Sequence, residues 1–274
     1  MKERLTIVKV GGAVVEDEVR LGALLDRFAS IATSKLLVHG GGRAATQTAA
    51  RLGLSTTMIE GRRVTDADML DVVTMVYGGL VNKRVVAQLQ ARGVNALGLT
   101  GADMDIIRSH RRPPVKLKDA DGQPTGQTVD YGYVGDVDRA DGQALQALIE
   151  RGVTPVVAPL THDGRGTLLN TNADTMAQTV ATALAPLYDV TLIFAFEKAG
   201  VLTRPDDDSS VIANIDSDSF RQLKADGVVS GGMVPKIENA LSAVAQGVGR
   251  VVITSADCIA EPGRGTSIQL RIKN

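Results

Sequence analysis

An α/β fold is predicted for this chain: a mostly parallel central sheet sandwiched by helices, with a β-hairpin insertion. Short β-branched runs alternate with longer amphipathic stretches along most of the sequence, which is typical of a parallel sheet covered on both faces. Prolines and turn residues interrupt this alternation at 104–139, where we expect the insertion. With 44% hydrophobic residues among 274, the chain has enough apolar side chains for a sizeable core.

The predicted elements follow one another in chain order. β-Branched runs predict strands at 5–10, 35–39, 95–99, 154–158, 191–196 and 250–254. Apolar residues at helical spacing predict helices at 18–32, 43–53, 66–92, 141–150, 174–186 and 234–246. Within the insertion, the turn pair Asp121-Gly122 and the alternation over 128–137 predict hairpins that project from the sheet and are placed to cover a site. The one candidate linker is at Ala185-Pro186.

Charge and composition exclude several classes of protein. Thirty Lys+Arg against 31 Asp+Glu leave a net charge of −1, which is not the strongly basic balance of a general nucleic-acid or anionic-membrane binder. Cys258 is the sole cysteine, so an intrachain disulfide is excluded and a reducing compartment, the cytoplasm, is expected. Because no run of 18 apolar residues occurs, we expect neither a signal peptide nor a membrane span, and the expected partner is a small molecule.

Glycines follow the first two predicted strands. Lys9 lies within the first strand and precedes Gly11 and Gly12, and the second strand runs into 40–42 before a predicted helix. Glycine lets backbone N–H groups approach an anion, and a helix N-terminus adds the positive end of its dipole. One such pair is typical of a tight turn. Two in successive βα units, one beside a lysine, predict a phosphate or carboxylate site.

The second turn also allows a dinucleotide interpretation. Residues 40–45 satisfy G-x-G-x-x-A after a strand, and Glu60 follows Gly40 by 20 residues. An NAD(P)-dependent oxidoreductase using Gly40–Ala45 is therefore a second hypothesis. It is the weaker one, because the match follows the second strand and Glu60 is not clearly at a strand end. A Walker A loop is excluded, since the sequence contains no Gly-Lys pair.

Three more segments carry candidate binding groups. Arg62 and Arg63 precede a predicted helix cap, and an arginine fork suits a carboxylate. Residues 170–174 bring two amides and Asp174 to a turn before a helix, and 230–236 open another helix with Lys236 in it. Each segment alone has a capping or surface explanation, whereas the combination favours a shared anion site.

Two charge runs have an ordinary explanation as solvated loop surface. The acidic run is 206–208, and the basic cluster consists of Arg108, Arg111, Arg112, Lys116 and Lys118. The alternative for the basic cluster is a rim that attracts an anionic substrate.

Seven motifs occur in the order found in the amino acid kinase family, and together they cover nearly the whole chain. They are VKVGG (8–12), VHGGG (38–42), GRRVTDADM (61–69), VNK (81–83), GYVGDV (132–137), NTNAD (170–174) and GGMVPK (231–236). The chain resembles that family, and within it the members that phosphorylate acylated glutamate. The resemblance implies ATP-dependent phosphorylation of the γ-carboxylate of an N-acylglutamate in arginine biosynthesis. N-acetyl-L-glutamate is the favoured substrate and N-succinyl-L-glutamate the alternative.

The resemblance also implies how the chain is divided and what binds to it. Residues 1–186 would form an acylglutamate-binding and dimerisation lobe, and residues 187–274 a nucleotide-binding lobe. ATP would be the cofactor, with Mg²⁺ held mainly by phosphates and water and with no metal-ligating residue. Relatives inhibited by arginine carry an additional N-terminal helix, whereas this chain enters its first strand by about residue 5. We therefore expect a homodimer insensitive to arginine, held through the first lobe's sheet and residues 66–92.

Residue roles follow from the matching motif positions. The implied catalytic residues are Lys9 and Lys236, which stabilise the transferring phosphoryl group, and Asp174, which orients them. The implied substrate-binding residues are Gly41, Gly42, Arg63 and Asn170. The implied phosphate- or nucleotide-binding residues are Gly11, Gly12, Gly200, Val201 and Gly232. The family pattern Thr/Ser-Asp-Val-x-Gly-Val is not kept at 196–201, where Gly200 and Val201 match but the aspartate is missing.

Elementary chemistry supports this reaction independently. A γ-carboxylate has an ordinary pKa of about 4.3, so at neutral pH it is already an ionised nucleophile and needs no general base. Catalysis then consists of in-line positioning and neutralisation of charge. The three histidines, His39, His110 and His162, are therefore expected to be structural or exposed. The alternative role for Asp174 is to cap the following helix. A third hypothesis for the whole protein is a non-catalytic small-molecule sensor. The presence of Lys9, Asp174 and Lys236 together argues against a sensor.

Overall fold

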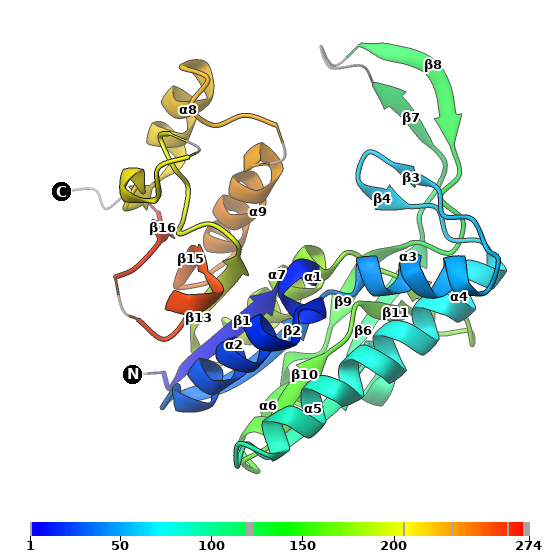
Figure 1. Ribbon diagram of the computed structural model, residues 1–274, viewed down its shortest axis with the longest axis horizontal. Coiled ribbons are helices and arrows are strands. Elements are labelled where there is room, and N and C mark those ends of the chain that lie inside the picture. Colours follow the sequence, from blue (N-terminus) through cyan, green and yellow to red (C-terminus); the bar gives the residue numbers. More distant parts are fainter. Residues whose placement is uncertain (1, 119–122, 205, 232, 262, 271–274) are drawn as a thin grey trace.

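An eight-stranded sheet forms the centre of the computed structural model, which describes residues 2–118, 123–204, 206–231, 233–261 and 263–270 (Figure 1). In spatial order its strands are β14 (Asn214–Ile215), β16 (Thr266–Ile268), β15 (Arg250–Ser255), β13 (Asp189–Phe196), β1 (Arg4–Val10), β2 (Ser34–His39), β10 (Thr154–Val157) and β5 (Ala96–Leu99). Neighbours are parallel except β15 and β16, which are antiparallel. The predicted α/β class is confirmed, and one sheet continues through the β1–β13 pair across the expected lobe boundary.

Helices cover both faces of this sheet (Figure 1). One face packs against α6 (Gly142–Ile149), α7 (Ala173–Leu184), α8 (Ser217–Ala225) and α9 (Met233–Ala245). The other packs against α1 (Gly12–Glu16), α2 (Glu18–Ser30), α3 (Gly42–Arg51), α4 (Ala67–Val73), the π-helix η1 (Thr74–Val81) and α5 (Asn82–Gln90). Short 3₁₀ turns are η2 (Asp103–Asp105), η3 (Asp208–Ser210) and η4 (Ala256–Cys258).

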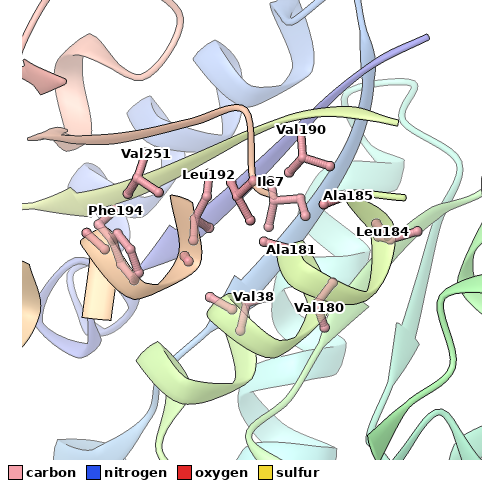
Figure 2. Packing of buried hydrophobic residues seen from close by; sticks show 14 of the residues in the cluster. Ile7, Val38, Val180, Ala181, Leu184, Ala185, Val190, Leu192, Phe194 and Val251 are labelled. Atoms are coloured by element: carbon pink, nitrogen blue, oxygen red, sulfur yellow. The ribbon is translucent and has the colours of Figure 1, made fainter. Parts of the chain in front are cut away.

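Side-chain alternation in the strands divides the core into two layers. In β1, Ile7 faces the α7 side, while Val8 belongs to the other layer. Figure 2 shows the first layer, in which strand residues such as Ile7 and Leu192 point toward Val180 and Leu184 of α7. Because both faces are buried, these strands are continuous apolar runs, and that explains why the sequence predicted them well.

The insertion differs from its prediction. A second sheet contains β12 (Leu168–Asn170), β11 (Leu160–His162), β6 (Ile107–Arg111) and β9 (Gly135–Ala140), in that order. Two of its strands come from the insertion, so only β7 (Val115–Lys118) and β8 (Pro124–Val129) form a projecting hairpin (Figure 1). The alternating residues at 128–137 do not form one strand, because β8 ends at Val129 and β9 begins at Gly135. The predicted turn pair Asp121-Gly122 lies outside the described residues.

A small hairpin of β3 (Met58–Ile59) and β4 (Arg62–Arg63) precedes α4. The sequence patterns did not predict this hairpin, α1 or α8. Short elements carry little periodicity, and α8 buries a single apolar residue, Phe220. In the described part of the chain, no helix is both long and apolar enough to cross a membrane.

Candidate active site

The two glycine turns lie against each other at the ends of neighbouring strands β1 and β2. The Gly11 N–H donates to the Ala195 carbonyl (3.2 Å) and the Gly40 N–H to the Val10 carbonyl (3.1 Å). A Cβ atom added at Gly40 would lie 3.3 Å from the Gly12 nitrogen, which is a tight contact. The close approach of the two backbones therefore favours glycine at this position, because any side chain would push the Gly12 backbone away.

A first pocket of about 440 Å³ opens beside these turns. Gly12, Gly41 and Gly42 form one wall, and the β3–β4 hairpin and the start of α7 form others. The helix α3 begins at this wall with Gly41 at its N-cap and no side-chain cap. The helix dipole therefore directs partial positive charge toward the pocket.

Arg63 and Asn170 line this pocket, as the sequence predicted for a substrate site. The Arg63 side chain is buried and donates to the Gly42 carbonyl (2.7 Å) and to the hydroxyls of Thr46 (2.8 Å) and Thr56 (3.2 Å). Among the described residues it makes no ion pair, so its charge is available to a carboxylate. Asn170 is held by a hydrogen bond from its Nδ2 to the Thr65 hydroxyl (2.9 Å).

A second pocket of about 330 Å³ contains the three predicted catalytic side chains. Lys9 from β1, Asp174 from α7 and Lys236 from α9 line it together, although they are far apart in the sequence. Gly12 and Ala13 line both pockets. The two pockets are therefore adjacent, and groups bound in them would lie close together near these two residues.

Lys9 and Asp174 form an ion pair in which Nζ lies 2.7 Å from Oδ1. Asn172 caps α7, accepting from the N–H groups of Asp174 and Thr175, so the suggestion that Asp174 is the cap is wrong. Burial lowers the pKa of Lys236, the Asp174 carboxylate opposes that effect, and Lys9 adds to it.

Some of the predicted phosphate- and nucleotide-binding residues line the second pocket, and Val201 does not. Gly11, Gly12 and Gly200 line the second pocket. A Cβ at Gly200 would lie 2.8 Å from the Thr266 hydroxyl oxygen, so this position needs glycine. Val201 is buried in the core, and its N–H donates to the same Thr266 hydroxyl (2.8 Å). Gly232 lies outside the described residues.

His39 is fully buried beneath the second glycine turn. Its Nδ1 lies 2.8 Å from the Gly40 carbonyl, and its Nε2 lies 3.1 Å from the Asn82 amide nitrogen. Nδ1 therefore donates and Nε2 accepts, as in a neutral imidazole. Burial lowers the His39 pKa from its ordinary value of 6.5 to about 4. The structural role that was expected of His39 fits these contacts.

Aspartates pair with the arginines of the basic cluster. Arg108 pairs with Asp105 (2.6 Å), Arg111 with Asp130 (2.9 Å) and Arg112 with Asp136. None of the three arginines lines the first pocket. For Arg108, Arg111 and Arg112 the geometry therefore does not support a rim for the substrate, because each of these three charges already has a partner.

The dinucleotide interpretation requires Glu60 at the carboxyl end of a sheet strand. Glu60 instead occupies the turn of the β3–β4 hairpin, with φ at 48°. Gly40–Ala45 consequently lacks the acidic partner that a ribose would need.

Several residues that line the two pockets were not assigned a site role from the sequence, among them Arg62, Tyr77 and Phe196. Arg62 and Tyr77 line the first pocket, and Phe196 lines the second. Arg62 was visible in its motif. Phe196 stands in the segment that departs from the family pattern. Tyr77 had no signal, because the π-helix that turns it toward Gly41 cannot be seen in a helical periodicity.

Comparisons with known proteins agree with this geometry. The profile of the amino acid kinase family matches residues 4–255. Acetylglutamate kinase of Phocaeicola vulgatus is 57% identical over 269 residues, which are 98% of this chain and 100% of that protein. Acetylglutamate kinase of Bacteroides fragilis is 56% identical over 98% of each chain.

Solved structures show the same fold. A protein of Streptococcus mutans has a TM-score of 0.74 at 28% identity, covering 97% of this chain and 98% of its own. N-acetylglutamate synthase of Neisseria gonorrhoeae, in complex with coenzyme A and N-acetyl-glutamate, has a TM-score of 0.77 at 21% identity. The match covers 98% of this chain and 60% of that one.

Proposed function

This chain belongs to the amino acid kinase family, and we propose that it transfers the γ-phosphoryl group of ATP to the γ-carboxylate of N-acetyl-L-glutamate, in arginine biosynthesis. The observation that carries the proposal is the meeting of two pockets at Gly12 and Ala13. The cation Arg63 lines one pocket, and two lysines with an aspartate line the other. A carboxylate acceptor and a triphosphate donor need this pair of neighbouring sites.

The reaction joins a γ-carboxylate oxygen to the γ-phosphorus, while the bond from that phosphorus to the bridging β,γ-oxygen breaks. The products are an acyl phosphate and ADP. No general base is required, because the nucleophile is ionised at neutral pH. Lys9 and Lys236 neutralise charge on the transferring group, and Asp174 orients Lys9 through their ion pair.

Substrate recognition is assigned to the first pocket. Arg63 would bind the α-carboxylate of the glutamate, since its guanidinium is buried, positioned by chain oxygens and without a carboxylate partner among the described residues. Gly41 and Gly42 would present backbone N–H groups, and Asn170 an amide. The γ-carboxylate would then be directed toward Gly12.

Magnesium would enter with ATP. In the part of the chain that the structure describes, no three His, Cys, Asp or Glu side chains gather to hold a metal ion. Asp174 is already paired with Lys9, so few protein oxygens are available in the second pocket. We therefore propose that phosphates and water hold Mg²⁺, which would neutralise the triphosphate.

N-succinyl-L-glutamate is a second candidate substrate, and Arg62 is the observation that favours it. Arg62 lines the first pocket, is half-buried, and has no hydrogen bond or ion pair among the described residues. Burial and then the neighbouring Arg112 lower the pKa of its guanidinium, while Asp136, Tyr131 and Glu60 oppose that effect from a distance. A succinyl carboxylate would provide the counter-charge, whereas acetyl would not.

The assay for the proposed reaction is hydroxamate formation. ATP, Mg²⁺ and N-acetyl-L-glutamate should yield ADP and an acyl phosphate that hydroxylamine traps. Lys9→Ala and Lys236→Ala should lower kcat more than they raise KM, because both lysines act as charge develops. Full turnover in both variants would show that the mechanism is wrong. Thermal stabilisation by NAD(P)H but not by Mg-ATP would favour the oxidoreductase instead.

A comparison of kcat/KM for the two acyl substrates distinguishes them. Preference for succinyl by tenfold or more, about 1.4 kcal/mol, would favour the second candidate. Arg62→Gln should then remove the preference, while Arg111→Gln, which alters an ion pair outside the pocket, should keep it. A preference for acetyl that is insensitive to Arg62→Gln would leave N-acetyl-L-glutamate as the substrate.

We also propose a homodimer formed through the β5 edge of the sheet. Leu97 on β5 and Met75 and Leu80 on η1 are large apolar side chains left between 40% and 54% exposed. β5 ends the sheet and so has unpaired backbone groups. The two-lobe division, the cytoplasmic location and insensitivity to arginine stay predictions.

A further inference from the structure

The second pocket contains an aromatic ring that the proposed mechanism does not use. Phe196 is the last residue of β13 and lines the pocket with Lys9 and Lys236. The Lys236 Nζ lies over its ring at 3.9 Å from the centroid, and the Lys9 Nζ at 5.2 Å. Both distances are within the range in which a ring attracts a cation through its quadrupole.

Sheet register places the ring beside Lys9, and Lys236 reaches it from α9, which covers the same face of the sheet. Lys9 and Phe194 are partners in the parallel β1–β13 pair, so their side chains leave the same face of the sheet. Phe196 lies two residues after Phe194 in the strand, so its side chain points to the same face. There the two rings stack, with centroids 6.1 Å apart and an angle of 4° between their planes. The stacked Phe194, buried in the core, supports the orientation of the Phe196 ring.

The charges around Lys236 indicate a role for the Phe196 ring. Asp174 forms its ion pair with Lys9, and Lys236 has no ion pair or hydrogen bond among the residues described. Lys236 is also half-buried, and Asp174 attracts its ammonium while Lys9 repels it. The Phe196 ring adds a second attraction, which opposes the cost of burial and the repulsion by Lys9 and so favours the ammonium inside the pocket.

We propose that Phe196 is a positioning residue for the phosphoryl-transfer lysines, and that its ring holds the Lys236 ammonium in the pocket beside Lys9 before the nucleotide binds. The ring also occupies the segment where the sequence departs from the family pattern, so it provides a role for that departure. The inference rests on the proposed function, in which Lys236 stabilises the transferring phosphoryl group.

Phe196→Leu tests the proposal, because leucine keeps an apolar side chain and removes the π face. We expect kcat to fall about tenfold, about 1.4 kcal/mol, with the KM for N-acetyl-L-glutamate unchanged, since Phe196 does not line the first pocket. Phe196→Tyr keeps the ring and should restore kcat. Phe220→Leu is the matched control, since it removes a ring that also lies under a lysine (Lys224, 5.9 Å) outside both pockets. It should keep kcat.

The pH profile gives a readout that a merely structural role would not change. Lys236 faces Lys9 and Asp174, and Glu197 and Lys198 line the same pocket. Loss of the ring should lower the Lys236 pKa further, so the alkaline limb of the kcat profile should move to lower pH in Phe196→Leu and not in Phe220→Leu.

Proton NMR of the ligand-free protein separates this inference from the proposed function. Ring current should shift the Lys236 Hε signals upfield, in a resonance identified by its loss in Lys236→Arg, and Phe196→Leu should abolish that shift. If wild-type protein forms no ADP, the proposed function fails and the NMR result alone decides the inference. An unchanged Lys236 shift, or a lowered kcat with an unchanged alkaline limb, would overturn it.

Discussion

Gly41 shows how a single missing side chain shapes the substrate pocket. A Cβ there would lie 2.9 Å from Cδ1 of Tyr77, whereas a Cβ at Gly42 would meet no atom within 4 Å. Gly41→Ala should therefore lower stability by about 1–3 kcal/mol through overpacking, and Gly42→Ala should not.

Thermal or urea unfolding of the two glycine variants checks this prediction. Tyr77→Leu in the Gly41→Ala background should recover part of the loss, because it removes the ring atom in the tight contact. Equal stability of the two single variants would contradict it.

His39 should make stability depend on acid pH. Its folded pKa of about 4 lies below the ordinary 6.5, so the unfolded chain binds a proton that the folded protein excludes. Stability should therefore fall as pH falls from 6.5 toward 4, by on the order of 3 kcal/mol in all, and this contribution should change no further below pH 4. Urea unfolding of wild type and His39→Gln at several pH values measures it. A variant with the same pH slope as wild type would refute the assignment.

At the scale of elements, the start of α7 connects helix capping to the site. Asn172 accepts two backbone N–H groups there, and one of them belongs to Asp174. Asn172→Ala should cost about 1 kcal/mol of stability and should also lower kcat, because Asp174 and its ion pair with Lys9 lose their support.

Asp141→Ala is the control for this variant. Asp141 caps α6 by accepting from the Ala144 N–H (3.0 Å), and it lines neither of the two pockets. It should lose similar stability and keep its kcat. Equal kcat values in the two variants would show that the cap does not position Asp174.

The long helix over 67–90 is continuous in sequence but not uniform in structure. Its middle is the π-helix η1, which contains Tyr77 and two glycines. A π-turn adds a residue to the turn and so rotates the following side chains relative to an α-helix. Within η1, Tyr77 is buried against the glycine turn while Met75 and Leu80 remain exposed.

For the whole molecule, assembly is the main prediction. Light scattering should give twice the chain mass of 28.8 kDa. Leu97→Glu should reduce that mass to one chain, because it places a charge on the exposed edge strand of the proposed interface. Val19→Glu, at an 82% exposed position on α2, should leave the dimer intact. A mass unaffected by Leu97→Glu would move the interface elsewhere.

Six of the eight strands of the main sheet, and the glycine turns that line the two pockets, could be predicted from the sequence. The six predicted strands and six predicted helices agree with the structure to within two residues at each end. Local patterns are sufficient for this, because a strand buried on both faces is a continuous apolar run and a glycine turn after a strand is a contiguous motif.

Which charged side chains meet in the site depends on the three-dimensional arrangement of the elements and could not be predicted from local patterns in the sequence. Lys9, Asp174 and Lys236 come together because β1 lies at the sheet centre between the strands of both halves, and α7 and α9 cover one face of it. The arginines of the insertion pair with aspartates that no local pattern connects to them. The Phe196 ring reaches Lys9 through β-sheet register and Lys236 through the packing of α9 on the same face. Such contacts depend on strand order and register over long sequence separations, and periodicity carries information only about neighbours along the chain.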